Sequence, residues 1–491
     1  MKKVAIILLF VFLVTFMIPV TYSQASSEPV RLILHLKEPV TSEKLAKLEK
    51  TGFHILYVFE ELNAVTGFVN EKNLNKISSL SFVKTIEYDV PRYALGEVLP
   101  ATDEVTGDVL TWDLDMINVP TVHEEYKLTG KGVYIAVLDT GLVPNWRDYF
   151  EEEKIATEFG RAFLAAAALT AHYNPAAWEY DTNSHGTHVT STIIGYWFYD
   201  FYRVAGVAPD AKVIPVKVLK SAGWGWTTDV VAGILYIAEL YKEEIETGGN
   251  VLEPKGVINP IIISMSLGGP VPSELEREAI DYAIDVGVIV VAAAGNEGEE
   301  GMSYPGGFPE VISVGAAGWT GEWSMPHWWR DADVPEREEG LVDQVYVTNF
   351  SSRERDGQEL DVLAPGSWIV GPYLAYGAAH PPYWSRGIPG QYYYLGGTSM
   401  ATPHVSGVIA LLLEYDLKDE QISLTQEIIE QILEESALYI PPGEASVYSP
   451  IYEDYVTFNW GDDAVGAGLV QADQAIKQVM EEFPTVTLEN G

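Results

Sequence analysis

From Gly132 onward, short apolar runs alternate with helical segments, and no other feature of the sequence constrains the fold as strongly. The first run, Val133–Leu138, is apolar or aromatic almost throughout, as a strand buried on both faces of a parallel sheet requires. Further strands and helices are predicted at Thr187–Ile194, Lys212–Val218, Asp229–Tyr241, Val257–Met265, Glu274–Val286, Val288–Ala292 and Val311–Val314. This alternation predicts an α/β fold with a mostly parallel sheet that is flanked by helices on both faces.

Three long segments interrupt the alternation, at about Leu142–Thr182, Trp319–Thr348 and Gly371–Tyr394. They are rich in Trp, Tyr, Pro and acidic residues. Loops of this length are uncommon in compact domains unless they have a function. We expect surface insertions, which either rim a binding cleft or only decorate the outside of the core.

The first 25 residues predict a secretory signal peptide. Two lysines precede an uncharged run, Val4–Val20, and small polar residues follow it at Ser23–Ala25. A single membrane anchor is the alternative, but the run is near the lower length limit for spanning a bilayer. We therefore expect a secreted, extracellular protein that is soluble and has no membrane contact in its mature form.

Residues 28–96 predict a small unit with the order β-α-β-β-α-β, which is the order of ferredoxin-like α+β domains. Its strands and helices are expected at Val30–Leu36, Thr41–Thr51, Phe53–Phe59, Ala64–Val69, Glu71–Ser78 and Phe82–Tyr88. Between Val90 and Leu110 the periodicity fails and Pro, Gly, Asp and Thr accumulate. This stretch predicts an exposed linker.

The formal net charge is −40, and the acidic excess lies after residue 100, because residues 28–100 hold nine basic and ten acidic side chains. Such a surface repels nucleic acid and anionic lipid, so neither is expected as a partner. It favours divalent cations. The chain contains no cysteine, so stability must come from packing, ion pairs or bound metal rather than from disulfides.

A serine stands at the start of a predicted buried helix. The stretch Gly396–Gly407 reads GGTSMATPHVSG, and Pro403 fits the first helical turn. Ser399 is then beside the positive end of the helix, where a developing negative charge is favoured. A serine in this place without partners is most often a helix cap, so a nucleophile needs a base and an acid elsewhere in the chain.

Two other stretches supply such partners. Asp139 ends the strand in GVYIAVLDTG, at the sheet edge where sites form in α/β folds. His185 begins a close-packed helix in NSHGTHVTSTIIG. Each of the three residues has a structural alternative when taken singly. Their chain order, Asp, His, Ser, differs from the order of the same triad in two other folds.

This pattern resembles the subtilisin-like serine proteases, or subtilases. Other stretches match the family in the same order, namely Gly206–Leu219, Ser264–Pro270 (SMSLGGP), Val290–Gly298 (VVAAAGNEG) and Asp361–Gly366 (DVLAPG). The resemblance covers about Ile117 to Ala475. It implies a serine endopeptidase of broad specificity that works through an acyl-enzyme intermediate and matures itself from an inhibited precursor.

The resemblance also implies an organisation and roles. We expect a signal peptide at 1–25, an inhibitory propeptide at 28–96, a linker with the maturation site at 97–110, a catalytic domain at 111–480 and a tail at 481–491. The cut bond is expected between Leu95 and Leu110. Ser399 would be the nucleophile, His185 the general base and Asp139 the residue that orients it, at neutral to alkaline pH. The side-chain amide of Asn296 would stabilise the oxyanion.

Substrate should pair its backbone with the strand edge that begins at Ser264. By resemblance, the substrate-binding residues are Ser264, Ser266, Leu267, Gly268, Ala293, Ala294, Gly295 and Ser303. Small residues on two walls of the primary substrate pocket leave room for a large apolar or aromatic side chain. Ser303 at the floor, where many relatives have Gly, is expected to shorten this pocket. The expected partners are protein and peptide substrates and the chain's own propeptide, and the enzyme should be a monomer.

Calcium is expected as a structural ion, and no cofactor is expected for catalysis. Asp148 matches a calcium-binding position of the family, although the loop Gly195–Val204 lacks the amide-rich run that usually completes that site. A metal pair of His185 and His188 is rejected, because protein metal sites need three or more ligands. His404 is expected to be a packed helix residue.

Three other functions fit less well. An α/β-hydrolase esterase would need Ser first and His last, with GxSxG around the serine. The carboxyl serine proteases share the fold but have Glu in place of His185. A binding protein that kept the fold and lost the chemistry would have no use for a propeptide.

Overall fold

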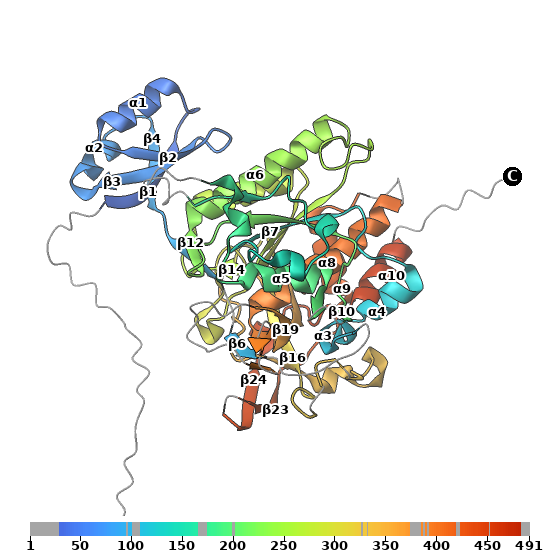
Figure 1. Ribbon diagram of the computed structural model, residues 1–491. Helices are drawn as coiled ribbons and strands as arrows, with labels where there is room; N and C mark the ends of the chain where they lie inside the picture. Colours follow the sequence, from blue (N-terminus) through green and yellow to red (C-terminus); the bar gives the residue numbers. More distant parts are fainter. Residues whose placement is uncertain are drawn as a thin grey trace, which may run out of the picture.

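The computed structural model describes residues 29–94, 97–100, 109–164, 174–198, 202–325, 328–330, 332–373, 384–385, 388–389, 392–418, 423–450 and 452–482. The predicted signal peptide lies outside the described residues, as does the tail beyond Glu482. Within this part of the chain, a small N-terminal unit stands to one side of a larger body (Figure 1).

The N-terminal unit has the strand and helix order that the sequence predicts. Its elements are β1 (Pro29–Leu36), α1 (Ser42–Lys50), β2 (His54–Phe59), β3 (Ala64–Asn70), α2 (Leu74–Ser78) and β4 (Val83–Tyr88). The four strands form an antiparallel sheet in the order β2-β3-β1-β4. Alternate residues of β1, among them Leu32 and Leu34, face the helices. Together with Leu48 of α1 they belong to a hydrophobic core within the N-terminal unit.

The larger body is built on an eight-stranded sheet, in the order β17-β16-β15-β13-β7-β11-β8, with β18 also paired to β16. Its strands are β7 (Tyr134–Asp139), β8 (Arg161–Ala162), β11 (Lys212–Lys217), β13 (Ile261–Met265), β15 (Ile289–Ala293), β16 (Ile312–Trp319), β17 (Val345–Val347) and β18 (Val362–Pro365). All pairings are parallel except that of β17 with β16. The predicted α/β class is confirmed.

Helices cover both faces of this sheet (Figure 1). Alternate residues of β7 point into different cores, as expected of a buried parallel strand. Tyr134, Ala136 and Leu138 pack with α6 (Thr227–Glu246) and α7 (Glu274–Asp285). Ile135 and Val137 belong to the core that contains α5 (His185–Ile194) and α8 (Thr398–Lys418). β7, which ends at Asp139, is therefore packed against helices on both of its faces.

Smaller elements complete the body. The remaining helices are α3 (Trp112–Met116), α4 (Val119–Thr121), α9 (Gln426–Ser436) and α10 (Ala472–Glu482). The remaining strands are β5 (Pro91–Ala94), β6 (Glu97–Pro100), β9 (Tyr196–Phe198), β10 (Tyr202–Val204), β12 (Trp224–Trp226), β14 (Leu267–Gly268), β19 (Ile369–Pro372), β20 (Trp384–Ser385), β21 (Ile388–Pro389), β22 (Tyr392–Gly396), β23 (Gly443–Ser449) and β24 (Asp454–Trp460).

The long aromatic-rich segments are not only surface insertions, and this expectation was wrong in part. Trp146 and Trp329 are fully buried, as are the three tyrosines of β22, and all of them belong to the core that contains α5 and α8. Trp328 stacks on Tyr394 with ring centroids 5.5 Å apart. Large aromatic side chains bury much apolar area each, so these segments enlarge the core instead of decorating it.

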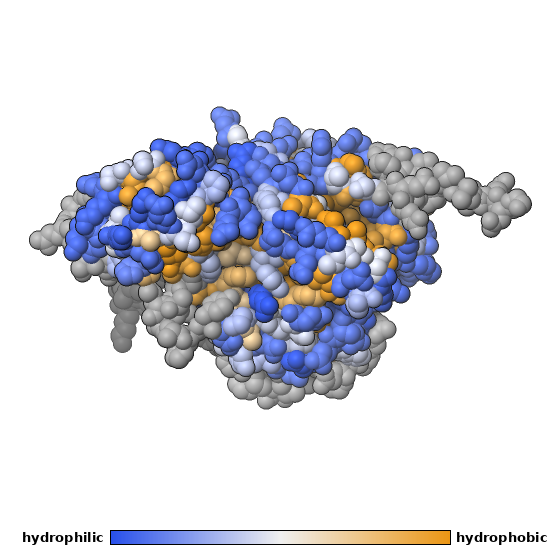
Figure 2. Space-filling view, turned by 90° about the horizontal axis from the view of Figure 1, so that it is seen from above, coloured by the Kyte–Doolittle hydropathy of each residue, from blue (hydrophilic) through white to orange (hydrophobic). Residues whose placement is uncertain are grey.

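The face of the molecule seen from above carries many hydrophilic residues, with apolar areas between them (Figure 2). Figure 2 shows hydrophilic residues over most of the face seen from above, including much of the N-terminal unit at its left. In the described part of the chain, no helix has both the length and the apolar character needed to cross a membrane.

Candidate active site

Asp139 and His185 meet at the carboxyl edge of the sheet. Asp139 is the last residue of β7, and His185 is the first residue of α5. His185 Nδ1 lies 2.9 Å from Asp139 Oδ2 and 3.0 Å from Oδ1, and both side chains are buried. Because a carboxylate only accepts hydrogen bonds, Nδ1 carries the proton and Nε2 is left as the basic nitrogen.

A hydrogen-bond network joins the end of β7 to the start of α5. Thr140 Oγ1 donates to Asp181 Oδ2 and accepts from the Gly186 backbone N–H. Asp181 Oδ2 also accepts from the Ser184 backbone N–H at 2.7 Å. A Cβ on Gly186 would lie 2.5 Å from the Gly141 carbonyl. Glycine at this position therefore lets the helix approach closely enough for His185 to reach Asp139.

Ser399 lies at the next strand end, in the first turn of α8. Its Oγ donates to the Ser266 carbonyl at 2.9 Å, and Ser266 Oγ donates to the Ser399 carbonyl at 2.8 Å. Strands β13 and β7 are parallel neighbours, so the residues beyond their carboxyl ends lie side by side. Since α5 and α8 also pack against each other, Asp139, His185 and Ser399 share one edge of the sheet.

Asn296 is held beside the start of α8. Its Oδ1 accepts from both the backbone N–H and the hydroxyl of Thr398, each at 3.0 Å. The Thr398 hydroxyl in turn accepts from the Gly295 backbone N–H at 3.2 Å. With the amide oxygen occupied, the NH₂ group is the part of Asn296 that remains to donate, next to the N-terminus of the helix that carries Ser399.

Of the predicted substrate-binding residues near β13, two lie on a strand edge and one is packed inside the fold. Leu267 and Gly268 form β14 and pair with Ala94 and Tyr93 of β5, as a strand edge that receives an extended chain would. Ser264 is different, because its hydroxyl accepts from Ser406 of α8 inside the fold. The structure thus places Ser264 in the packing between sheet and helix, away from that edge.

Ala293, Ala294, Gly295 and Ser303 come together at the end of β15. The Ser303 backbone N–H donates to the Ala294 carbonyl at 2.8 Å. The Ser303 hydroxyl donates to Glu297 Oε2 at 3.0 Å, and Ser352 donates to the same oxygen at 3.1 Å. Sequence reasoning missed the roles of Glu297 and Ser352, because no local pattern connects residues so far apart in the chain.

The predicted linker contributes strands that flank Ser399. β5 lies between β12 and β14 in a three-stranded antiparallel sheet. β6 pairs with β22, where Glu97 is opposite Gly396, three residues before Ser399. The predicted linker is therefore not irregular at these two strands, which pair with strands of the larger body. Their regular pairing is supplied by the larger body, and their own sequence has no strand periodicity.

Comparison with known proteins agrees with this geometry. The model of the Subtilase family matches residues 130–469. The chain belongs to the subtilase family. It is a subtilisin-type serine endopeptidase, and its expected membership is confirmed.

Two relatives of this subtilase match it over most of their length. Subtilisin E of Bacillus subtilis (strain 168) is 28% identical over 410 residues, which are 82% of this chain and 81% of the relative. A thermostable alkaline protease of Halalkalibacterium halodurans is 28% identical over 425 residues, or 86% and 91% of the two chains.

A solved structure has the same fold. Fervidolysin from Fervidobacterium pennivorans, a keratinolytic enzyme related to subtilisin, matches with a TM-score of 0.60 and 22% identity. The match covers 92% of this chain and 61% of fervidolysin. The subtilase thus spans about three fifths of that structure, and the likeness concerns the fold.

Two further histidines of the subtilase lie near the site. His188 is buried, and its Nε2 is 3.0 Å from the Ile369 carbonyl. Burial, together with the neighbouring His185, lowers the pKa of His188 to about 3, so it stays neutral. His404 is packed in α8 as expected, but its Nε2 also lies 2.9 Å from Asp113 Oδ2.

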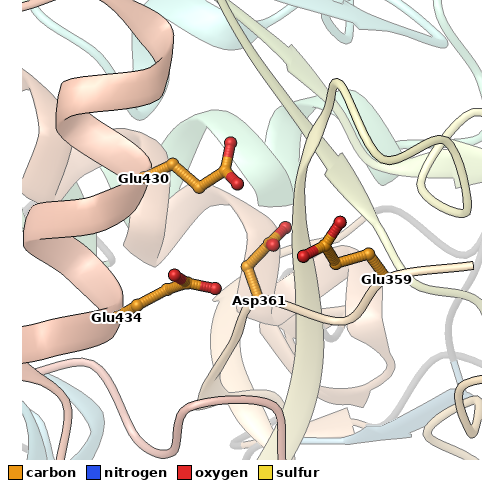
Figure 3. Close-up of side chains that lie close together, drawn as sticks. All are labelled: Glu359, Asp361, Glu430 and Glu434. Carbon is orange, nitrogen blue, oxygen red and sulfur yellow. The ribbon is translucent and has the colours of Figure 1, made fainter.

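One group of side chains in the described part of the subtilase could hold a metal ion, and it does not include Asp148. The ligand atoms of Glu359, Asp361, Glu430 and Glu434 lie within 4.8 Å of one another. Figure 3 shows Glu430 and Glu434 reaching from α9 toward Asp361 and Glu359. Asp148 instead accepts a hydrogen bond from the Asn145 amide at 3.0 Å.

The charges of this acidic cluster are poorly compensated. Burial raises the pKa of Asp361 well above its ordinary value. Burial and the charges of Glu434 and Glu359 raise the pKa of Glu430 to about 7. Like-charged carboxylates disfavour one another's ionised forms, and hard oxygen ligands in this number suit Ca²⁺. The cluster is thus a further candidate for calcium, and calcium at Asp148 stays a prediction.

Proposed function

We propose that this subtilase is a secreted endopeptidase that cleaves proteins with Asp139, His185 and Ser399 as its catalytic triad. The observation that carries the proposal is the contact of His185 Nδ1 with both oxygens of Asp139, at the sheet edge where α8 presents Ser399. This contact fixes the tautomer in which Nε2 can accept a proton, as a general base must.

The proposed reaction has two halves. Ser399 Oγ attacks the substrate carbonyl while its proton passes to His185 Nε2, and Asp139 stabilises the imidazolium that forms. The imidazolium then gives the proton to the leaving amine, and an acyl-enzyme ester remains on Ser399. A water molecule, deprotonated by His185 in the same way, attacks the ester, and the proton returns to Ser399 Oγ as the carboxylic acid leaves.

The negative charge of each tetrahedral intermediate needs donors that are already in place. The Asn296 NH₂ group and the Ser399 backbone N–H are proposed for this role, since Thr398 fixes the amide orientation through Oδ1. Donors that need no reorganisation during the reaction stabilise the transition state most. The loss of one such donor costs roughly 3–4 kcal/mol, a magnitude known from a subtilisin.

We also propose that residues 28–96 act as an inhibitory propeptide and that the chain cuts itself. β5 pairs with β14, which follows Ser266, and β6 pairs with β22, which ends three residues before Ser399. Extended pairing of this kind is how a peptide adds to a sheet edge. The maturation bond would then lie between Leu95 and Glu97, at the start of the expected range of Leu95 to Leu110.

Replacing Ser399 with Ala tests both parts of the proposal. The variant should remain a full-length precursor and show no hydrolysis of casein, whereas the wild-type chain should separate into two products. A Ser399→Ala precursor that matures alone at the wild-type rate would exclude self-processing. N-terminal sequencing of the exported precursor tests the leader, with a start near residue 26 expected.

A further inference from the structure

Arg92 is an arginine with no exposed surface, held where the N-terminal segment meets the larger body. It lies within β5, opposite Gly225 of β12. Its Nε donates to Glu276 Oε1 at 3.0 Å, and its Nη2 contacts Glu276 Oε2. Neither side chain has accessible surface. The pair has the two-pronged geometry in which a planar guanidinium best recognises a carboxylate.

Glu276 belongs to the larger body and is held there independently of Arg92. It lies in the first turn of α7, where its backbone N–H donates to the capping Ser273 hydroxyl at 3.4 Å. A negative charge is favoured at this end of a helix. Gly269 leaves space for the Arg92 side chain and the β5 backbone. A Cβ at this position would lie 3.1 Å from Arg92 Nη1 and 2.8 Å from the Pro91 carbonyl oxygen.

The strand that carries Arg92 lies along the strand edge at which we expect an extended substrate to bind. β5 pairs with β12 on one side and with β14 on the other, and its last residue, Ala94, is opposite Leu267. Ser266, the residue before Leu267, receives the hydrogen bond of the Ser399 hydroxyl. In this antiparallel register, an extended chain comes opposite Ser266, and so beside Ser399, three residues after the side chain that faces Glu276.

Departure of β5 leaves Glu276 without the cation that neutralises it. A substrate that covers Glu276 again without supplying a cation leaves a buried, unpaired charge, which is strongly unfavourable. A substrate with arginine opposite Gly225 restores the pair, and a substrate with an apolar side chain there does not. Lysine restores the charge but not the two parallel hydrogen bonds.

We propose that Glu276 forms an arginine-binding subsite, and that this enzyme prefers protein substrates with arginine at the position Arg92 occupies. The inference rests on the proposed proteolytic function and narrows its expected broad specificity. The main-chain pairing to β12 and β14 accepts any sequence, and Glu276 adds selection for one side chain.

Fluorogenic peptides with the sequence of residues 89–100, DVPRYALGEVLP, test the subsite on the mature enzyme. The set has Arg, Lys, Gln or Leu at the position of Arg92, and phosphonate titration gives the concentration of active sites. We expect kcat/KM to fall from Arg to Lys and further to Gln and Leu, by about 10²-fold from Arg to Leu. Equal kcat/KM for Arg and Leu in fully titratable enzyme would overturn the subsite.

Variants of α7 separate recognition from helix stability. Glu276→Gln keeps the shape of the side chain, and Glu276→Leu removes its polarity; both should bring the Arg-to-Leu ratio of kcat/KM close to one. A purely structural role would lower both values together and leave their ratio unchanged. Glu274→Gln removes an exposed charge from the same turn and should keep the wild-type ratio. If the wild-type chain takes up no phosphonate and cleaves neither casein nor any peptide, the proposed function fails, and the subsite with it.

Discussion

Asp139, His185 and Ser399 are 46 and 214 residues apart along the chain, yet each occupies the end of a regular element. Asp139 ends a strand, and the other two begin helices. The residue-scale chemistry therefore depends on where elements start and stop. A carboxylate at a strand end can orient a histidine only if the following helix begins within reach, which the Thr140–Asp181–Ser184 hydrogen bonds ensure.

Replacement of Asp139 by Asn tests whether Asp139 orients His185. The amide can still contact His185, but it favours the wrong tautomer, so kcat should fall by about 10⁴-fold with little change in KM. Steady-state kinetics at saturating and limiting substrate measure both constants. A loss of less than tenfold would show that Asp139 does not orient the general base.

Replacement of Asn296 by Ala tests the proposed oxyanion donor separately. We expect kcat to fall by roughly 10²–10³-fold at unchanged KM, because the donor acts on charge that develops in the transition state. Ser352→Ala, which removes a hydrogen bond to Glu297 nearby, is the comparison variant. Similar effects of the two substitutions would argue against a specific role for Asn296.

The site residues that sequence could predict are those with local signatures. Glycine and hydroxyl residues around Ser399 and the strand before Asp139 occur within short stretches, so a reader of the sequence finds them. Arg92 and Glu276 form their pair across 184 residues, and neither has a distinctive neighbourhood. Glu430 and Glu434 were not predicted as possible metal ligands for the same reason, since many helices carry Glu one turn apart.

At the scale of elements, the N-terminal unit is attached through the end of β4. Residues there contact the first turns of two helices of the larger body, α6 and α7. Asp89 accepts from the backbone N–H and the hydroxyl of Thr228 in α6. Glu87 accepts from the backbone N–H groups of Glu274 and Leu275 in α7. Carboxylates at helix N-termini satisfy free N–H groups and the helix dipole together. Sequence predicted the unit and its strand order, but not this mode of attachment.

His35 makes this attachment sensitive to pH. Its Nε2 is 3.1 Å from Glu87, and its Nδ1 is 3.4 Å from Glu278 of α7. Burial alone would lower the pKa of His35, but the Glu87 hydrogen bond and the charges of Glu278, Glu87 and Glu274 raise it above its ordinary value. A raised pKa in the docked state means that docking is strongest below about pH 6.5 and weakens as pH rises through the raised value.

We therefore expect the cleaved N-terminal unit to dissociate faster as the pH rises above 6.5. The rate at which activity appears after cleavage measures this step. His35→Gln should flatten the pH dependence, whereas His54→Gln, at an exposed position of β2, should leave it intact. Dissociation that is independent of pH in the wild-type chain, or fastest in acid, would contradict the expected role of His35.

For the whole molecule, the net charge of −40 means that the acidic groups repel one another in the folded state. A bound cation should therefore raise the free energy of unfolding. We propose that Ca²⁺ binds the acidic cluster of Glu359, Asp361, Glu430 and Glu434, whose ligand atoms lie within 4.8 Å of one another. Burial raises the pKa of three of these carboxyl groups, those of Asp361, Glu430 and Glu434. Groups with raised pKa bind more protons in the folded state than in the unfolded state. Without calcium, stability should therefore fall as pH rises from about 4.5 toward 7.

Thermal unfolding of the Ser399→Ala precursor tests this proposal without self-digestion. Calcium should raise Tm strongly at pH 8 and little at pH 5, where protons neutralise part of the cluster. Glu430→Gln should raise Tm in chelator and reduce the response to calcium, while Asp148→Asn should change neither. An unchanged Tm in chelator at pH 8 would show that the fold needs no ion.

The central claim is that one alcohol, Ser399, is activated at the carboxyl edge of the sheet. Its most direct test is reaction of the mature enzyme with an irreversible serine-directed phosphonate, followed by peptide mapping. The account predicts one adduct per molecule, on Ser399, formed in proportion to the loss of activity and absent from His185→Ala. An adduct on another serine, or full activity retained after Ser399 is modified, would contradict it.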